Sequence, residues 1–275
     1  MQTSDRVQQP AEWPRTSFSL RVMGAIAVLA TIGCGAVSIG VLGGVDGRPM
    51  VLRYGLAYGG LVLLVAAFGV LTRWPRSGST VRCAAAEVGA ATEIRQSRGV
   101  WAMLVAMTAC CAAITAGPAV DIYLSAETSG VPGATVVFGV QGALFGSFLV
   151  LVVLRRVRPG SVLLTPDGVR HRGWSFDSYL PWESVAGVKA AYSDHRMVLL
   201  IGFANAQWTR RYTTPIWRID KLPPVPMIEL DCRKFAMDDV LLLLFIIRFY
   251  ADNPAMRGEL GTAAAHDRFA LRDFT

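Results

Sequence analysis

The residues best suited to bind a ligand lie in one stretch of the C-terminal half, QWTRRYTTPIWRIDKLPPVP, which runs from Gln207 to Pro226. Such a mixture of aromatic and basic side chains is typical of surfaces that contact a membrane interface or phosphate-bearing lipid headgroups. A second interpretation is a sheet edge and a long loop whose side chains lie along the surface with their charged ends in water. We call the following residues the basic–aromatic segment: Trp208, Arg210, Arg211, Tyr212, Trp217, Arg218 and Lys221.

Residue patterns typical of enzymes and metal sites are absent from the sequence. It has no GxSxG, HExxH, Walker or dinucleotide-binding glycine motif. The adjacent Asp238 and Asp239 stand where a helix start favours negative charge, and Glu183 has no evident partner. The five cysteines form no CxxC motif, and the three histidines form no cluster. We therefore expect no catalytic residues, no metal and no cofactor.

Composition indicates a membrane protein. Hydrophobic residues make up 53% of the 275 residues and charged residues 17%, whereas a soluble domain carries about 25% charge. Four runs contain no Asp, Glu, Lys or Arg, at 22–45, 54–72, 100–120 and 133–154. A helical crossing needs about 20 such residues, so we predict a four-helix transmembrane domain over 22–154. The first run starts too late and is too long for a cleaved signal, so we interpret it as a span.

Arginines predict the orientation of these spans. The N-terminal tail 1–21, the loop 73–99 and residues 155–158 together contain eleven arginines, whereas the other side has only Arg48 and Arg53. Because cytoplasmic loops are enriched in Lys and Arg, we expect an inner-membrane protein with both termini in the cytoplasm. The net charge of +7 fits this arginine excess or an attraction to anionic headgroups. No nucleic-acid-binding motif is present.

The predicted spans contain no ionisable residue, and Gln141 is the only strongly polar side chain at depth. Ion pathways usually need charge within the membrane, so a transporter or channel is disfavoured, although a pore formed by several copies stays open. Glycine pairs at GxxxG spacing let helices approach closely, either within the bundle or between two copies of the chain. These pairs are Gly40–Gly44, Gly55–Gly59 and Gly142–Gly146.

From Arg155 onward, short apolar runs alternate with turn signals. We predict six or seven antiparallel strands, near 161–165, 169–173, 179–182, 185–192, 197–203, 207–213 and 227–232. The apolar run 240–247 is too short to cross a membrane and predicts a helix of about 15 residues that covers the sheet. The Ala-rich part of the loop 73–99 predicts a short helix over 81–94. Residues 255–275 predict a flexible tail, with FALRDFT as a docking segment.

Short strands followed by one helix are the layout of a pleckstrin-homology (PH) fold. Three stretches resemble the PH-like domains that follow transmembrane helices in actinobacterial membrane proteins of unknown function: VLLTPDGVRHRG, YLPWESVAGV and LFIIRFYADNPAMRGEL. The last matches the family pattern at Tyr250, Asn253, Pro254, Arg257 and Leu260. The resemblance covers about 155–261 and implies an α+β domain at 155–254, a bent antiparallel barrel closed by a helix. These motifs mark a fold and are not catalytic signatures.

In eukaryotic PH domains a basic cluster in the first hairpin holds phosphoinositide phosphates. Here Arg170 and Arg172 lie in the second strand, which is too little charge in the wrong place to transfer that activity. We expect a non-enzymatic multi-pass membrane protein whose PH-like module binds a protein partner or the membrane surface in a scaffold or regulatory role. Its partners would be membrane lipids, an unidentified protein or a second copy of the chain. The alternatives are a transporter or channel component gated by the module, and an anionic-lipid sensor.

Overall fold

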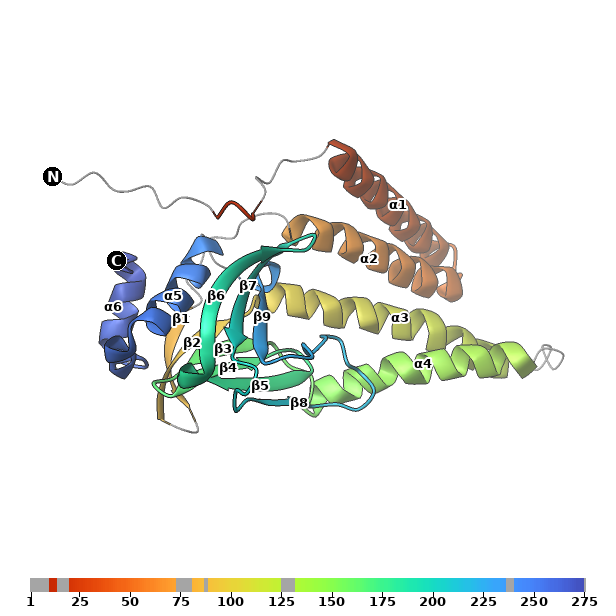
Figure 1. Cartoon of the computed structure of the whole chain (residues 1–275). Coiled ribbons are helices and arrows are strands. Elements are labelled where there is room, and N and C mark those ends of the chain that lie inside the picture. The colour runs from red at the N-terminus through yellow and green to blue at the C-terminus, as the bar shows by residue number, and fades with distance from the viewer. Residues whose placement is uncertain are drawn as a thin grey trace. The chain divides into compact units, whose positions relative to one another are not determined.

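A computed structural model describes residues 10–13, 20–72, 81–86, 89–124, 132–235 and 240–274 (Figure 1). The chain divides into two compact units. One consists of residues 17–74 and 98–158 and contains the four long helices, and we call it the helical unit. The other consists of residues 1–16, 75–97 and 159–275 and contains the described strands, and we call it the β-domain.

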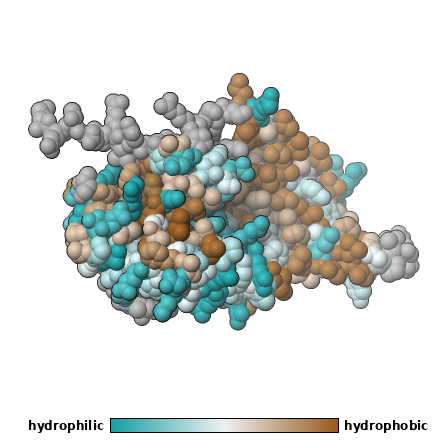
Figure 2. Space-filling model, in the orientation of Figure 1, coloured by the Kyte–Doolittle hydropathy of each residue, from teal (hydrophilic) through white to brown (hydrophobic). Residues whose placement is uncertain are grey.

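The helical unit confirms the four predicted apolar helices. They are α1 (Leu20–Val45), α2 (Pro49–Leu71), α3 (Arg98–Leu124) and α4 (Pro132–Val153). Each has at least 22 residues, which at about 1.5 Å per residue spans a hydrocarbon core of about 30 Å. Figure 2 shows apolar side chains gathered over these helices. The chain is therefore a multi-pass membrane protein with a C-terminal β-rich domain.

Glycines set the close contact between α1 and α2. A Cβ atom placed on Gly40 would lie 2.9 Å from the Cα atom of Gly55, and one placed on Gly59 would lie 2.8 Å from the carbonyl oxygen of Gly33. Gly44 packs on Leu52 of α2 in the same way. On the other side of the unit, a Cβ atom on Gly142 of α4 would lie 2.9 Å from the Cα atom of Ala116 of α3. Gly146 has no described atom in contact range.

The larger sheet of the β-domain has six antiparallel strands in the order β1-β2-β3-β4-β5-β8. The strands β3 (Ser161–Leu164), β4 (Gly168–Arg172) and β5 (Phe176–Pro181) form the predicted meander. At one edge lies β8 (Thr209–Tyr212), and at the other lie β2 (Gly89–Arg95) and β1 (Val81–Ala86).

The prediction of a helix over 81–94 is wrong, because this stretch forms the β1–β2 hairpin. β2 pairs with β3 from Thr92 opposite Leu164 to Arg95 opposite Ser161. Alanine favours helices, but the backbone of β3 offers hydrogen bonds that only an extended segment can fill. The loop between the second and third spans is therefore part of the sheet.

The smaller sheet has the order β6-β7-β9, from β6 (Val185–Tyr192), β7 (Arg196–Gly202) and β9 (Met227–Asp231). The helix α5 (Val240–Asp252) follows the sheet, as predicted. Its buried side chains Leu243, Ile246, Ile247 and Tyr250 recur at helical spacing and join the core of both sheets. Short 3₁₀ turns follow β5, β9 and α5, at Trp182–Ser184, Cys232–Lys234 and Pro254–Glu259. Asp238 and Asp239 lie outside the described residues.

The expected flexible tail is also wrong. Residues 263–271 form the helix α6 (Ala263–Leu271), on which Phe269 is buried. The ring of Phe274 lies 5.8 Å from the rings of both Phe249 and Phe269. Phe274 of the FALRDFT stretch therefore packs on Phe249 of α5, which agrees with the prediction of a docking segment.

The N-terminal segment also contributes to the β-domain. Trp13 is 3% exposed and belongs to its core. The Trp13 indole N–H donates to the carbonyl oxygen of Ala191 at 2.9 Å. Residues before the first helix, between the second and third helices and after the fourth thus fold into one unit. If each helix crosses once, all three segments lie on the same side of the membrane.

Candidate functional site: a basic–aromatic face of the β-domain

The basic–aromatic segment begins at β8, an edge strand of the larger sheet. β8 pairs with β5, with Asp177 opposite Arg211 and Ser178 opposite Arg210. Side chains alternate along a strand, so Arg210 and Tyr212 lie on one face of the sheet and Arg211 on the other. The strand therefore divides the predicted site residues between two faces.

On the first face, two aromatic rings each carry an arginine. The guanidinium carbon of Arg210 lies 5.0 Å from the ring centroid of Trp208, and that of Arg218 lies 4.8 Å from the ring centroid of Tyr212. Such cation–π contacts are worth about 0.5–1 kcal/mol at exposed sites. Arg210 also donates a hydrogen bond to the carbonyl oxygen of Pro223. These contacts hold the 213–226 loop against β8 and fix both arginines.

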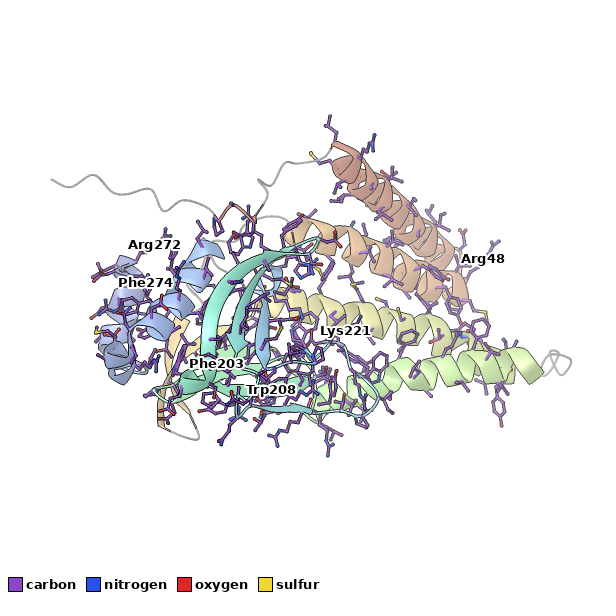
Figure 3. All side chains as sticks on the ribbon, in the orientation of Figure 1. Arg48, Phe203, Trp208, Lys221, Arg272 and Phe274 are labelled. Carbon is purple, nitrogen blue, oxygen red and sulfur yellow. The ribbon has the colours of Figure 1, made fainter. Side chains whose placement is uncertain are left out.

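Two exposed apolar side chains lie in the segments that flank β8 and its loop. The Gly202 N–H donates to the Pro226 carbonyl oxygen at 2.7 Å, which places Phe203 near Val225. These two side chains are 51% and 50% exposed. Figure 3 labels Phe203 and Trp208, which a short turn connects. We call the following residues the basic–aromatic face: Phe203, Trp208, Arg210, Tyr212, Arg218 and Val225.

The first nearby carboxylate, Asp177, lies on the other face of the sheet with Arg211 and is already neutralised. Asp177 accepts hydrogen bonds from Arg170 Nε at 2.9 Å and Arg170 Nη2 at 2.7 Å. A longer contact of 3.4 Å joins Asp177 to Arg211. Arg170 therefore holds β4 to β5 through Asp177, and Arg211 contacts the same carboxylate at the surface.

The second carboxylate, Asp220, is engaged in the same way. It accepts a hydrogen bond from the Trp174 backbone N–H at 3.0 Å and forms an ion pair with Lys234. The Asp220 side chain is only 9% exposed. Among the described residues, neither Arg210 nor Arg218 has a carboxylate partner. The basic–aromatic face is thus a patch of uncompensated positive charge.

The other two predicted site residues, Trp217 and Lys221, lie in the 213–226 loop. Trp217 is half-buried, and its carbonyl oxygen accepts a hydrogen bond from the Thr214 hydroxyl at 2.8 Å. Lys221 is exposed. Both residues belong to the loop that carries Arg218, so Lys221 adds positive charge to the same loop.

His171 lies on the buried side of β4. Its side chain is 5% exposed, and its Nε2 atom has no hydrogen-bond partner among the described residues. Burial lowers the pKa of His171 to about 4, with an opposing attraction from Asp220 and a further lowering by Lys234. The histidine is therefore neutral at pH 7 and belongs to the core rather than to a phosphate-binding cluster.

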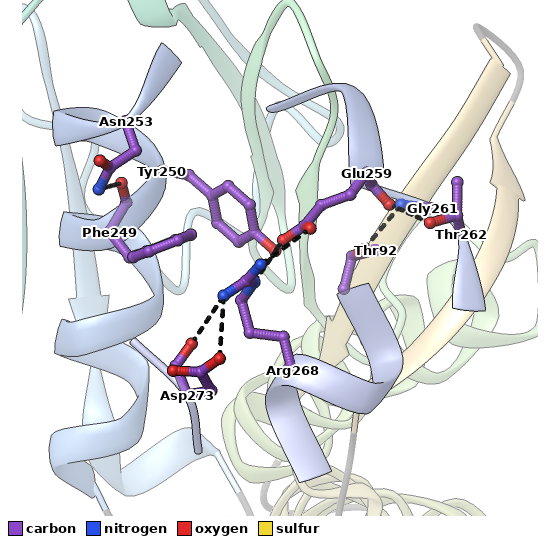
Figure 4. A network of polar contacts seen from close by, with 9 residues as sticks. All are labelled: Thr92, Phe249, Tyr250, Asn253, Glu259, Gly261, Thr262, Arg268 and Asp273. Carbon is purple, nitrogen blue, oxygen red and sulfur yellow. Dashed lines mark hydrogen bonds and ion pairs between the residues drawn. The ribbon is translucent and has the colours of Figure 1, made fainter. Parts of the chain in front are cut away.

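The YADNPAMRGEL stretch forms a structural network instead of a binding site (Figure 4). The buried Tyr250 hydroxyl donates to Glu259 Oε1 at 2.8 Å. Arg268 Nε donates to the same oxygen at 2.6 Å, and its guanidinium lies 4.8 Å from the ring centroid of Phe249. Burial would raise the pKa of Glu259, but hydrogen bonds from Arg268 and Tyr250 outweigh it and hold the pKa below its ordinary value.

Arg257 of the same stretch closes the C-terminal end of α5. It donates to the carbonyl oxygens of Tyr250 at 2.8 Å and Ala251 at 2.9 Å, which are free at a helix end. Its guanidinium also lies 5.2 Å from the ring centroid of Trp182. Leu260, at the end of the pattern, is 1% exposed. The spacing of these residues is therefore explained by helix capping and core packing.

Sequence reasoning missed one charged cluster in the helical unit. α2 and α3 extend beyond the predicted spans and include Arg53 and Asp121. Arg53 Nη2 lies 3.3 Å from Asp121 Oδ1, and the Tyr54 hydroxyl donates to Asp121 Oδ2 at 2.6 Å. A charge-free run ends at its first charged residue, so a charge pair that joins two helix ends gives no signal in the sequence.

Comparison of the chain with family models, curated proteins and solved structures found no match.

Proposed function

We propose that this chain is a non-enzymatic inner-membrane protein whose β-domain is a cytoplasmic binding module for an anionic surface. The basic–aromatic face supports this proposal. On it, neither Arg210 nor Arg218 pairs with a carboxylate among the described residues. Exposed Phe203 and Val225 belong to the segments that flank β8 and its loop. Apolar side chains that enter an interface and cations that contact headgroups are the combination that binds an anionic membrane.

The arginine distribution supports the cytoplasmic placement. Cationic loops stay in the cytoplasm, and the three segments that build the β-domain are the arginine-rich ones. The anionic lipid of the inner leaflet would then be within reach of the module. A scaffold role is part of this proposal, because a membrane-bound module can hold an assembly at the bilayer. Proteolysis of spheroplasts and of inverted vesicles tests the orientation, since we expect cleavage of the β-domain only in inverted vesicles.

We also propose that the β-domain is a PH-like fold with additions. Seven strands from β3 to β9 form two antiparallel sheets and are followed by α5, which supports this assignment. The β1–β2 hairpin, α6 and Trp13 are additions to that layout. An experimental structure that shows the two sheets closing as a bent barrel against α5 would agree with the assignment, and open, separate sheets would contradict it.

The transporter or channel alternative gains little from Arg53 and Asp121. Arg53 lies four residues into α2, which is about 6 Å from the helix start. This depth corresponds to the headgroup region rather than the bilayer centre, where charges that serve an ion pathway are placed. The pair therefore supports an interfacial role.

The binding proposal is tested by hydrogen–deuterium exchange of the full chain in nanodiscs, either neutral or containing an anionic phospholipid. We expect slower exchange of 213–226 in anionic nanodiscs, weakened by salt and by the double change Arg210→Gln/Arg218→Gln. The matched control Arg248→Gln removes an exposed arginine of α5 and should leave the protection intact. Equal exchange in both lipids would reject the membrane surface, and protection only by an added acidic protein would assign the face to a protein partner.

A further inference from the structure

A cavity of about 350 Å³ lies between α2 and α3 in the helical unit. Small side chains line much of it and leave room between the two helices. The lining residues are Arg53, Tyr54, Leu56, Ala57, Ala113 and Gly117. The cavity is apolar over most of its wall and has Arg53 as its charged residue. None of the lining residues belongs to the basic–aromatic face, so this site is independent of the function proposed above.

The polar end of this cavity is fixed by hydrogen bonds. Tyr54 and Arg53 both contact the Asp121 carboxylate, at 2.6 Å and 3.3 Å. The Asp121 side chain is 17% exposed, whereas the Arg53 side chain is 57% exposed. The contact with Asp121 uses Arg53 Nη2 and leaves the other guanidinium N–H donors without a partner among the described residues. Arg53 is thus held in place with donors to spare, and guanidinium donors suit phosphate oxygens.

The cavity extends from headgroup depth into the hydrocarbon region. Arg53 is four residues from the start of α2, or about 6 Å along the axis. Ala113 is eleven residues from the end of α3, or about 16 Å. A ligand that fills the cavity therefore needs a charged group at one end and an apolar chain at the other.

We propose that this cavity is a phospholipid site. The lipid phosphate binds Arg53, and one acyl chain lies along Leu56, Ala57, Ala113 and Gly117. These helix ends are opposite those that connect to β1 and β2, so the lipid belongs to the leaflet on the side away from the β-domain segments. Asp121 positions Arg53, and the small side chains make room for the chain.

Native mass spectrometry of the full chain, released from nanodiscs of phosphatidylethanolamine and phosphatidylglycerol, tests the site. We expect one phospholipid to stay bound. Arg53→Gln removes the phosphate contact, and Ala113→Phe fills the apolar part of the cavity. Losing a charge-assisted hydrogen bond weakens binding about tenfold, so Arg53→Gln should retain the lipid about tenfold less often. Ala113→Phe should also lose the lipid, because its ring occupies the space of the acyl chain.

Two control variants isolate the cavity. Arg48→Gln removes the arginine just before α2, and Val140→Phe adds a ring on an exposed face of α4; both should keep the lipid. The proposal is overturned if the wild-type protein carries no bound phospholipid, or if all four variants retain it equally. It is also overturned if Arg53→Gln and Ala113→Phe instead abolish a dimer that carries no lipid, because the cavity would then belong to an interface between two copies.

Discussion

The β-domain contains two clusters of arginines and aromatic rings that differ in one respect. Around Glu259, Arg268 lies over Phe249 and binds a carboxylate, and its side chain is 17% exposed. On the basic–aromatic face, Arg210 and Arg218 lie over Trp208 and Tyr212 and are exposed, with no described carboxylate partner. We call the cluster around Glu259 the closed cluster and the basic–aromatic face the open cluster. In this domain the same residue types thus stabilise the fold where an acid pairs with the arginine, and they remain available to a ligand where no acid does.

The largest expected effect comes from breaking the closed cluster. Arg268→Gln leaves the Glu259 carboxylate, 13% exposed, without its ion-pair partner. Removing one partner of a fully buried pair costs about 3–5 kcal/mol. We expect a loss of about 3 kcal/mol or somewhat less, because this pair is partly exposed and Tyr250 still donates to Glu259. Denaturant unfolding of the full chain in detergent measures it. A loss below about 0.5 kcal/mol would contradict a structural role for the cluster.

A pH-dependent change in the free energy of unfolding, of similar size, is expected from the buried His171. The unfolded chain protonates His171 near the ordinary pKa of 6.5, whereas burial holds the folded pKa at about 4. Stability should therefore fall as pH drops from about 6.5 to about 4, by about 3 kcal/mol. Unfolding of the wild type and His171→Leu across this range isolates the contribution. Identical pH profiles would show that His171 is not buried in neutral form.

A smaller effect is expected from the tyrosine of the closed cluster. Tyr250→Phe keeps the buried ring and removes one hydrogen bond to Glu259. A net loss of about 1–2 kcal/mol follows. Combined with Arg268→Gln in a double-mutant cycle, it should show coupling, because both groups donate to the same carboxylate. Strictly additive losses in denaturant unfolding would argue against one network.

The smallest effect on stability is expected on the basic–aromatic face. Arg218→Gln removes an exposed cation that contacts only the Tyr212 ring among the described residues. Its unfolding free energy should change by less than about 1 kcal/mol, while protection of 213–226 by anionic nanodiscs should decline. A loss as large as that of Arg268→Gln would erase the distinction between the two clusters.

The strands after Arg155 and the four spans were predictable because turn residues and charge-free runs mark them directly. The β1–β2 hairpin was not, because its Ala-rich sequence has no strand signature and its structure comes from pairing with β3. The helix α6 was missed because its small residues give little helical pattern, although Phe269 is buried. The placement of Arg210 and Arg211 on opposite faces follows from side-chain alternation along a strand. The ion pair of Arg211 was not predictable, because its partner Asp177 lies on another strand.

Photo-crosslinking tests most directly that the open cluster is the one that binds. The full chain is reconstituted with an anionic phospholipid that carries a photoactivatable group at its headgroup, and labelled peptides are mapped. We predict labelling within 203–226, reduced by salt and by Arg210→Gln/Arg218→Gln, and no labelling around Glu259 and Arg268. Labelling that avoids 203–226, or that is unchanged in the double variant, would contradict the account.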